Sequence, residues 1–136
     1  MGSAFSVLGP LATPAAVGAT GTGDATATLT TSQVVNGIVR GVYIKYEGSP
    51  PGTTDVTVAT ASTAPQPPAQ TILAVANGNT DGWRYPVAVG NLNTTGAALA
   101  DGFKYVPIMI ANPVTITIAE ANDADYIQVW LLMECI

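Results

Sequence analysis

Two clusters of oxygen-bearing side chains are the places in this sequence where residue type and spacing suit chemistry. In the first, Asn77, Asn79 and Asp81 alternate, and a glycine stands at the sixth position of the segment. This spacing matches the first half of a calcium-binding loop, but the twelfth position is Ala88 instead of a bidentate glutamate. Because Asn, Asp and Gly are also the residues of tight turns, we favour a hairpin turn here and assign no metal.

The second cluster brings acidic side chains together between two apolar segments: Glu120, Asn122, Asp123 and Asp125. Two carboxylates about 5–10 Å apart can hydrolyse a glycosidic bond. A turn between strands is also where acids are easily solvated or paired across an interface, and we favour that interpretation. A hydrolase that uses Glu120 and Asp123 remains a third hypothesis for the function.

Other catalytic chemistry is limited by what the composition lacks. The 136 residues include no histidine and one cysteine, Cys135, so Ser-His and Cys-His nucleophiles and zinc or haem sites built from these residues are excluded. Cys135 follows an acidic residue, which disfavours a reactive thiolate. We therefore expect a protein that is not an enzyme and needs no cofactor.

Charge excludes two further classes of partner. Only 10% of the residues are charged, against about 25% in ordinary soluble domains, and the formal net charge is −5. The four basic residues are scattered, so we predict no binding to nucleic acid and none to an anionic membrane surface. The longest apolar stretches, at 106–111 and 127–133, are far shorter than the roughly 18–20 residues of a membrane-spanning helix. The N-terminus resembles no secretory signal, so we expect synthesis in a cytoplasm.

Period-two patterns dominate the chain after residue 24. Short alternating or apolar segments are separated by Gly-, Pro- and Asn-containing turns, and no segment has convincing helical periodicity. The pattern predicts an all-β, antiparallel sandwich or barrel. The predicted strands are residues 25–31, 37–47, 55–61, 71–76, 83–89, 103–111, 114–119 and 126–133, with a polar loop at 91–102.

The first 23 residues look different from the rest. Their Gly-, Pro-, Ala- and Thr-rich sequence has neither a strand nor a helix period, which predicts an extended N-terminal arm (1–23) before a β-sandwich domain (24–136). The apolar residues Leu11 and Val17 are the predicted partner contacts of this arm. Deletion of the arm is expected to leave the sandwich folded and to weaken assembly.

Aromatic residues offer a further candidate surface. Trp83 and Tyr85 follow the turn at 77–82, and Tyr43 and Tyr46 lie in an earlier predicted strand. Aromatic faces with polar tips suit both sugars and protein interfaces. Since aromatics make up only 7% of the chain, we favour packing in a core or subunit interface, with an exposed platform at Trp83 and Tyr85 as the alternative.

The layout of the chain resembles that of small capsid decoration, or cement, proteins of tailed bacteriophages. The resemblance covers about residues 36–134 and includes the segments GIVRGVYIKYEGSPPGTTDVTVATA, TDGWRYPV and DYIQVWLLME. It implies a jelly-roll-like β-sandwich that docks as a symmetric oligomer, a homotrimer or a homodimer, between major capsid proteins. Such a protein would be located on the capsid surface of the virion and would stabilise the head without doing chemistry.

Two functions remain open from the sequence. The first is capsid decoration, in which neutral Thr, Ala and Val surfaces are buried between subunits with little desolvation of charge. The second is a receptor- or glycan-binding module of a phage tail or head fibre, with Trp83 and Tyr85 as the contact residues.

Overall fold

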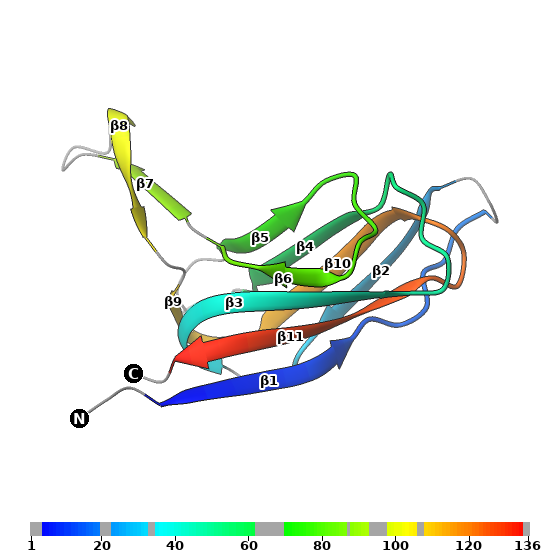
Figure 1. The fold of residues 1–136 in the computed structure, drawn as a ribbon, viewed down its shortest axis with the longest axis horizontal. Helices are drawn as coiled ribbons and strands as arrows, with labels where there is room; N and C mark the ends of the chain where they lie inside the picture. The colour runs from blue at the N-terminus through cyan, green and yellow to red at the C-terminus, as the bar shows by residue number, and fades with distance from the viewer. Residues whose placement is uncertain are drawn as a thin grey trace.

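The computed structural model describes residues 4–19, 23–32, 35–61, 70–86, 88–92, 98–105 and 108–134. Every regular element in these residues is a β-strand (Figure 1). No helix long and apolar enough to cross a membrane occurs among them. The strands form two antiparallel sheets that pack face to face, so the predicted all-β antiparallel sandwich is confirmed.

The strands are shared between the two sheets and one separate hairpin. The first sheet has the order β1 (Phe5–Ala12), β11 (Tyr126–Glu134), β3 (Val35–Glu47) and β6 (Gly82–Arg84), and β9 (Ile108–Asn112) pairs with the start of β3. The second sheet has the order β2 (Ala25–Thr30), β10 (Val114–Ala121), β4 (Asp55–Thr60) and β5 (Thr71–Val75). Strands β7 (Ala88–Leu92) and β8 (Ala98–Tyr105) pair with each other and project from the sandwich (Figure 1).

The strand pairs of the sandwich are nested along the chain. Strand β4 pairs with β5, β3 with β6, β2 with β10, and β1 with β11. Along the sequence, the two strands of each pair therefore stand on either side of the pair named before it. Successive pairs belong to alternate sheets. This is the pairing of one long antiparallel ribbon folded over on itself.

The core lies between the sheets and follows the period-two pattern. In β10, Val114, Ile116 and Ile118 are fully buried, and the threonines between them face outward. In β11, Val129 and Leu131 are fully buried in the same way. Alternation of this kind places one face of each strand in the core and leaves the other for solvent or a partner.

The segment predicted as an arm belongs partly to the sandwich. Residues Phe5–Ala12 form edge strand β1, which pairs with β11, and Leu8 and Leu11 pack against the core. Thr13 and Ala16 are buried where the chain crosses to the second sheet. Gly9 and Pro10 interrupt the register and hide the strand pattern, and the partner strand lies at the other end of the sequence.

Three further segments differ from the sequence prediction. The strand predicted at 83–89 is divided between β6, which ends at Arg84, and β7, which begins at Ala88. The predicted loop at 91–102 contains the end of β7 and the start of β8, which form the hairpin. The single strand predicted at 103–111 is divided between β8, which ends at Tyr105, and β9, which begins at Ile108. The two strands then pair in different places, one within the hairpin and the other with β3.

Tyr46 on β3 carries a buried hydroxyl with no hydrogen-bond partner among the described residues. Burial raises the pKa of Tyr46 above its usual value of 10.0, because the phenolate would be poorly solvated. The folded state therefore favours the neutral phenol: stability is unaffected below the unfolded-state pKa and falls as pH rises through the folded-state pKa.

Tyr46→Phe is expected to leave the free energy of unfolding unchanged or to raise it by about 1 kcal/mol, because a buried unsatisfied hydroxyl is removed. Between neutral pH and pH values above about 10, the variant should lose less stability than the parent chain. Urea unfolding at both pH values measures this. A clear destabilisation at neutral pH would mean that the hydroxyl is hydrogen-bonded after all.

Candidate functional site

The outer face of the second sheet is a regular array of threonine and alanine, which we call the threonine face. One row crosses all four strands, because Thr28, Thr117, Thr57 and Ala74 are register partners in turn. The neighbouring row contains Thr30, Thr115 and Ala59, and the hydroxyl oxygens of Thr30 and Thr115 are 3.2 Å apart.

Charge is confined to one end of this sheet. Across β2, β4, β5 and β10, all of whose side chains the structure describes, the charged residues are Asp55 and Glu120. Asp55 accepts a hydrogen bond from the backbone N–H of Asn77 at 2.9 Å. The threonine face is therefore neutral over its centre, and burying it desolvates few charges.

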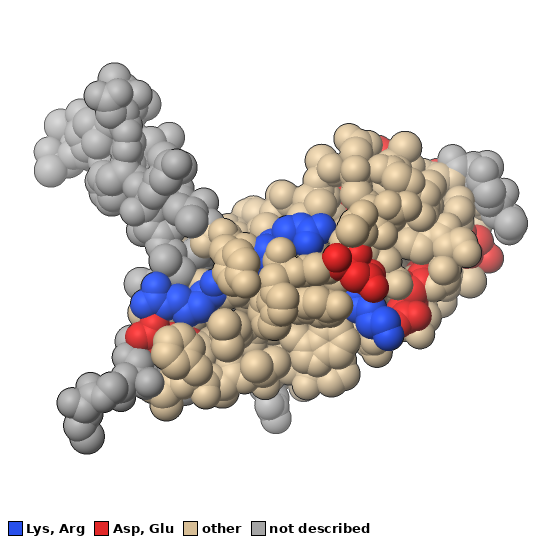
Figure 2. Space-filling model, in the orientation of Figure 1, with Lys and Arg blue, Asp and Glu red and all other residues tan. Residues whose placement is uncertain are grey.

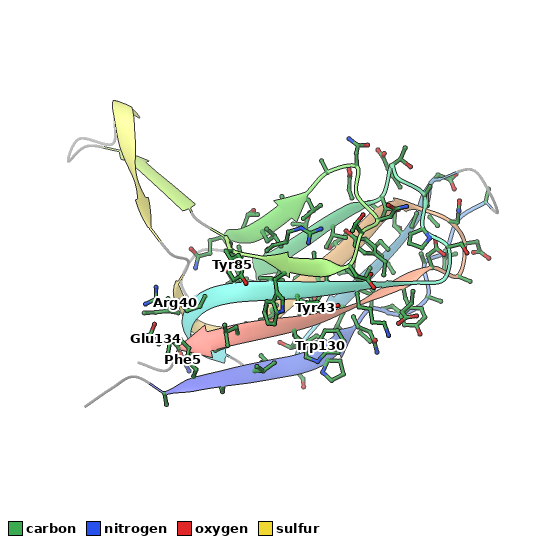
Figure 3. The ribbon with its side chains drawn as sticks, in the orientation of Figure 1. Phe5, Arg40, Tyr43, Tyr85, Trp130 and Glu134 are labelled. Atoms are coloured by element: carbon green, nitrogen blue, oxygen red, sulfur yellow. The ribbon has the colours of Figure 1, made fainter. Side chains whose placement is uncertain are left out.

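The outer face of the first sheet carries a row of aromatic rings. Trp130 on β11, Tyr43 on β3 and Trp83 on β6 are register partners, so their side chains stand next to one another on one face. Tyr85 follows β6 and stacks beside Trp83 (Figure 3 labels Tyr43, Tyr85 and Trp130). We call these residues the aromatic row.

The rings of the row pack in two geometries. Tyr43 makes edge-to-face contacts with Trp83 and Trp130, at centroid distances of 5.4 and 5.6 Å. Trp83 and Tyr85 are nearly parallel, with an interplanar angle of 12° and a centroid distance of 6.5 Å. Trp83 is 42% exposed and Tyr85 is 70% exposed, so the parallel pair is a platform open to solvent.

Two glycines make room for these rings. At Gly41 on β3, a side chain would lie 3.2 Å from Trp83 Cε3 and 3.4 Å from Tyr85 Cε1, so both rings rest on bare backbone. At Gly9 in the β1 bulge, a Cβ atom would lie 2.9 Å from Trp130 Cδ1. The row therefore depends on small residues in the two neighbouring strands.

A shallow groove runs along the row. It has a volume of about 270 Å³ and is lined by Val7, Tyr43, Trp83 and Trp130. The lining comes from β1, β3, β6 and β11, so the sheet register itself shapes the groove. The groove is shallow and slightly smaller than the about 300–1,000 Å³ that is typical of small-molecule pockets.

Charged groups surround the aromatic row without entering it. Figure 2 shows basic groups at both ends and along one side of an uncharged area. Arg40 pairs with Glu134 at one end, and Lys45 pairs with Glu47 at the other, with a Lys45 Nζ to Glu47 Oε1 distance of 2.8 Å. The hydrogen bond to Glu47 raises the pKa of Lys45 above its usual value.

The calcium-loop candidate is a turn whose polar groups bond to neighbouring segments, but it is not the predicted hairpin, because it joins β5 of one sheet to β6 of the other. Asp81 Oδ1 accepts a hydrogen bond from the backbone N–H of Tyr46 at 2.8 Å, and Asn79 Nδ2 donates to the Pro50 carbonyl at 3.0 Å. Asn77 has a positive φ of 55°, as turn residues often do. Within the described part of the chain, no group of three or more His, Cys, Asp or Glu residues is arranged to hold a metal ion.

The acidic cluster has a structural centre at Asp125, which is buried. Its Oδ1 accepts from the backbone N–H of Ser49 and its Oδ2 from that of Asn122, both at 2.9 Å. The Asp125 carbonyl accepts from Ala16 N–H at 2.7 Å. One residue thereby ties together three segments: the β3–β4 loop, the β10–β11 turn and the crossing between β1 and β2.

The two acids considered for hydrolysis lie on the rim of this turn. Glu120 is exposed and has a positive φ of 51°. Asp123 is also exposed, and its Oδ1 accepts from Gly18 N–H at 3.4 Å. The grooves at the aromatic row and between β1 and β2 are lined by residues other than these two.

The predicted partner contacts Leu11 and Val17 are not adjacent to the aromatic row. Leu11 lines a groove of about 460 Å³ between edge strands β1 and β2, together with Leu8 and Leu29. Val17 is 76% exposed and forms a backbone bridge to Thr26. The candidate residues thus fall on two surfaces: Trp83 and Tyr85 on one, Leu11 and Val17 near another.

Sequence reasoning missed Trp130 and the role of Tyr43 in this site. Both alternate with buried residues in their strands, which is the signal that they face outward. Their adjacency follows only from the β11–β3 register, which the sequence does not show. Cys135 lies outside the described residues.

Comparisons with known proteins add little. No protein-family model and no curated protein matches the chain. Among solved structures, an exo-β-1,3-galactanase from Phanerochaete chrysosporium with galactose matches 97% of this chain at 12% identity and a TM-score of 0.34. This chain covers 29% of that protein. A similarity at this TM-score establishes neither the fold nor the function.

Proposed function

We propose that this chain is a structural virion protein of a bacteriophage, a capsid decoration protein that binds between major capsid proteins and stabilises the head. It does so as a homo-oligomer, a homotrimer or a homodimer, and without chemistry. It is made in the host cytoplasm and is located on the capsid surface. The sandwich is of the jelly-roll type, as its nested strand pairs suggest.

The threonine face is the observation that carries this proposal. A solvated sheet face ordinarily bears Lys and Glu, whereas here Thr and Ala fill two rows across the sheet. Such a face can be buried against a protein without desolvating a charge. A capsid presents the same contact many times, so modest contacts per subunit suffice when an oligomer engages several at once.

Thr117→Arg tests the proposal, because it places a charge at the centre of the threonine face. Purified protein is titrated onto phage heads that lack it, and occupancy is measured by cosedimentation and electron microscopy. The parent chain should saturate sites between capsomers, and the variant should bind about tenfold more weakly or worse, since a buried unpaired charge costs more than about 1.4 kcal/mol.

Thr53→Arg is the matched control, because it makes the same change at an exposed residue of the β3–β4 loop. It should bind as the parent chain does, and thermal melts should show that both variants are folded. Density elsewhere than between capsomers, or equal loss in both variants, would contradict decoration through the threonine face.

A receptor- or glycan-binding module of a phage tail or head fibre is a second candidate. The aromatic row favours it, because Trp83 and Tyr85 are exposed on the sheet opposite the threonine face. The two candidates predict different sensitivities. Particle binding should depend on Thr117 under the first and receptor binding on Trp83 under the second.

A further inference from the structure

Large apolar side chains gather on the outer face of the first sheet. Among the described residues, the exposed large hydrophobic side chains are Phe5, Val7, Val17, Trp83 and Tyr85. All except Val17 belong to this face, because Phe5 and Val7 alternate with the inward-facing Leu8 on β1 and the other two belong to the aromatic row. Exposed apolar patches that are surrounded by polar groups mark sites of interaction.

A second row of small and apolar residues lies beside the aromatic row. Val7 on β1, Leu132 on β11 and Gly41 on β3 are register partners in turn. The ring of Tyr85 covers Gly41, where an added Cβ atom would lie 3.4 Å from Tyr85 Cε1. The face is therefore apolar across the whole width of the sheet. We call it the apolar face, and its large side chains are Val7, Tyr43, Trp83, Tyr85, Trp130 and Leu132.

The charges around the apolar face cancel one another and stand at its two ends (Figure 2). On β1, β3 and β11 the charged residues are Arg40 and Glu134, which pair at one end, and Lys45 and Glu47, which pair at the other. Arg84 on β6 is the register partner of the buried Val42 and so does not belong to this face. An apolar, aromatic centre with charges at the rim is the composition of a protein–protein interface.

The two ends of the apolar face complement each other when the face meets its own copy. Along β3, Arg40 precedes Tyr43 by three residues and Glu47 follows it by four. A two-fold axis that lies in the plane of contact, along the aromatic row, turns the second copy over and exchanges its ends. Arg40 of each copy then lies opposite Glu47 of the other, and the two aromatic rows meet. A symmetric contact of this kind uses the same patch on both subunits.

We propose that the apolar face binds a second copy of this chain and forms a two-fold symmetric homodimer. Two apolar sheet faces pack on each other in the dimer, as they do in the core of a sandwich. Although the chain carries a formal net charge of −5, the contact brings together surfaces whose own charges sum to zero. The inference rests on the proposed function in that decoration requires a homo-oligomer, and it leaves the threonine face free to dock.

Sedimentation equilibrium of the full chain, without phage heads, tests the proposal. The parent chain should be a dimer that dissociates on dilution. Val7→Arg should weaken dimerisation about tenfold or more, because Val7 is 56% exposed in one chain and the dimer would bury an unpaired charge there. Val17→Arg is the matched control, because it makes the same change at an exposed valine outside the apolar face, and it should dimerise as the parent chain does.

Tryptophan fluorescence reports on the same surface, because both tryptophans of the chain, Trp83 and Trp130, belong to the apolar face. Dimerisation should shield them, so acrylamide should quench the parent chain less at high protein concentration than at low concentration. Val7→Arg should be quenched strongly at both concentrations, whereas Val17→Arg should behave as the parent chain does. Circular dichroism should show that both variants are folded.

Exchange of charges tests the orientation of the two copies. Arg40→Glu and Glu47→Arg should each weaken the dimer, because like charges then face each other across the contact. A chain with both changes should dimerise better than either single variant, although each ion pair within the chain is then replaced by like charges. Only contact between copies explains such a recovery, and its failure would refute the two-fold axis along the row.

The proposal is overturned if the parent chain is a monomer at every concentration, and the aromatic row is then available to a glycan. It is also overturned if Val7→Arg dimerises like the parent chain, or if Val17→Arg weakens the dimer equally. Dissociation by Thr117→Arg instead would place the contact between copies on the threonine face. Because the test contains no phage heads, a stable dimer of Thr117→Arg that fails to bind heads separates the two proposals.

Discussion

A chain that lacks residues 1–23 is expected not to fold. It loses β1 and with it the partner of one edge of β11, the packing of Leu8 and Leu11, and the buried Ala16. Leu8 and Leu11 are partly buried, so each contributes less than the about 1.5–3 kcal/mol of a fully buried leucine; together with the lost backbone pairing to β11, this is a large share of the about 5–15 kcal/mol total stability of a domain. Circular dichroism and urea unfolding of the truncated chain measure the effect.

This expectation reverses the one drawn from the sequence, in which residues 1–23 are an arm and the remaining sandwich folds alone. A chain that begins at Ala4 is the control, because it retains all of β1 and should unfold like the full chain. If the shorter chain instead unfolds cooperatively at a similar urea concentration, β1 contributes little and the arm interpretation is the better one.

Asp125→Ala is expected to lower the free energy of unfolding by about 3–5 kcal/mol. The carboxylate accepts hydrogen bonds from the backbone N–H groups of Ser49 and Asn122, and hydrogen bonds to charged groups are worth about 1.5–3 kcal/mol each. Both donors would lose their partner at a site that is almost fully buried. Urea unfolding at neutral pH measures the loss.

Asp123→Ala provides a matched comparison two residues away. Asp123 is exposed and its one contact, from Gly18 N–H, is long at 3.4 Å, so the change should stay within about 0.5 kcal/mol. Asp125→Asn should fall between the two, because the amide keeps one acceptor and presents a donor to the other N–H. If Asp125→Ala and Asp123→Ala lowered the free energy of unfolding equally, the structural role assigned to Asp125 would be refuted.

The same site explains why residue 48 is glycine. Gly48 has a φ of +85°, a conformation that side chains disfavour, and a Cβ atom there would overlap Asp125 Oδ1. The loop can therefore approach the carboxylate closely enough for Ser49 N–H to donate to it. From the sequence, the run of glycine and proline at 48–52 predicts a turn but not the acid it encloses.

The strands that the sequence predicts best are short patterned segments between turn residues. Strands β2, β4, β5, β10 and β11 begin where predicted: residue types alternate along β2, β4, β10 and the first part of β11, and an apolar run marks β5. Strand β1 escapes prediction because its bulge at Gly9 and Pro10 breaks the period. Sheet pairing is a long-range property, and a period-two pattern does not specify the partner of a strand.

The candidate site was predictable only in part for the same reason. Trp83 and Tyr85 lie two residues apart in the sequence and stand out as aromatic residues after a turn. Tyr43 and Trp130 join them through the register of β3 with β6 and β11. The acidic cluster illustrates the reverse error: its spacing is compatible with catalysis, yet burial and backbone contacts give Asp125 a structural role.

The nested strand pairs also imply an order of assembly. The pair β4–β5 closes a short loop, whereas Phe5 of β1 must find Glu134 of β11 across almost the whole chain. The entropic cost of closing a loop grows with the length of the loop. We therefore expect the strand pairs to form in order of increasing sequence separation, with β1 pairing last. The seam between β1 and β11 is then the part of the sandwich to form last and, in reverse, the first to open.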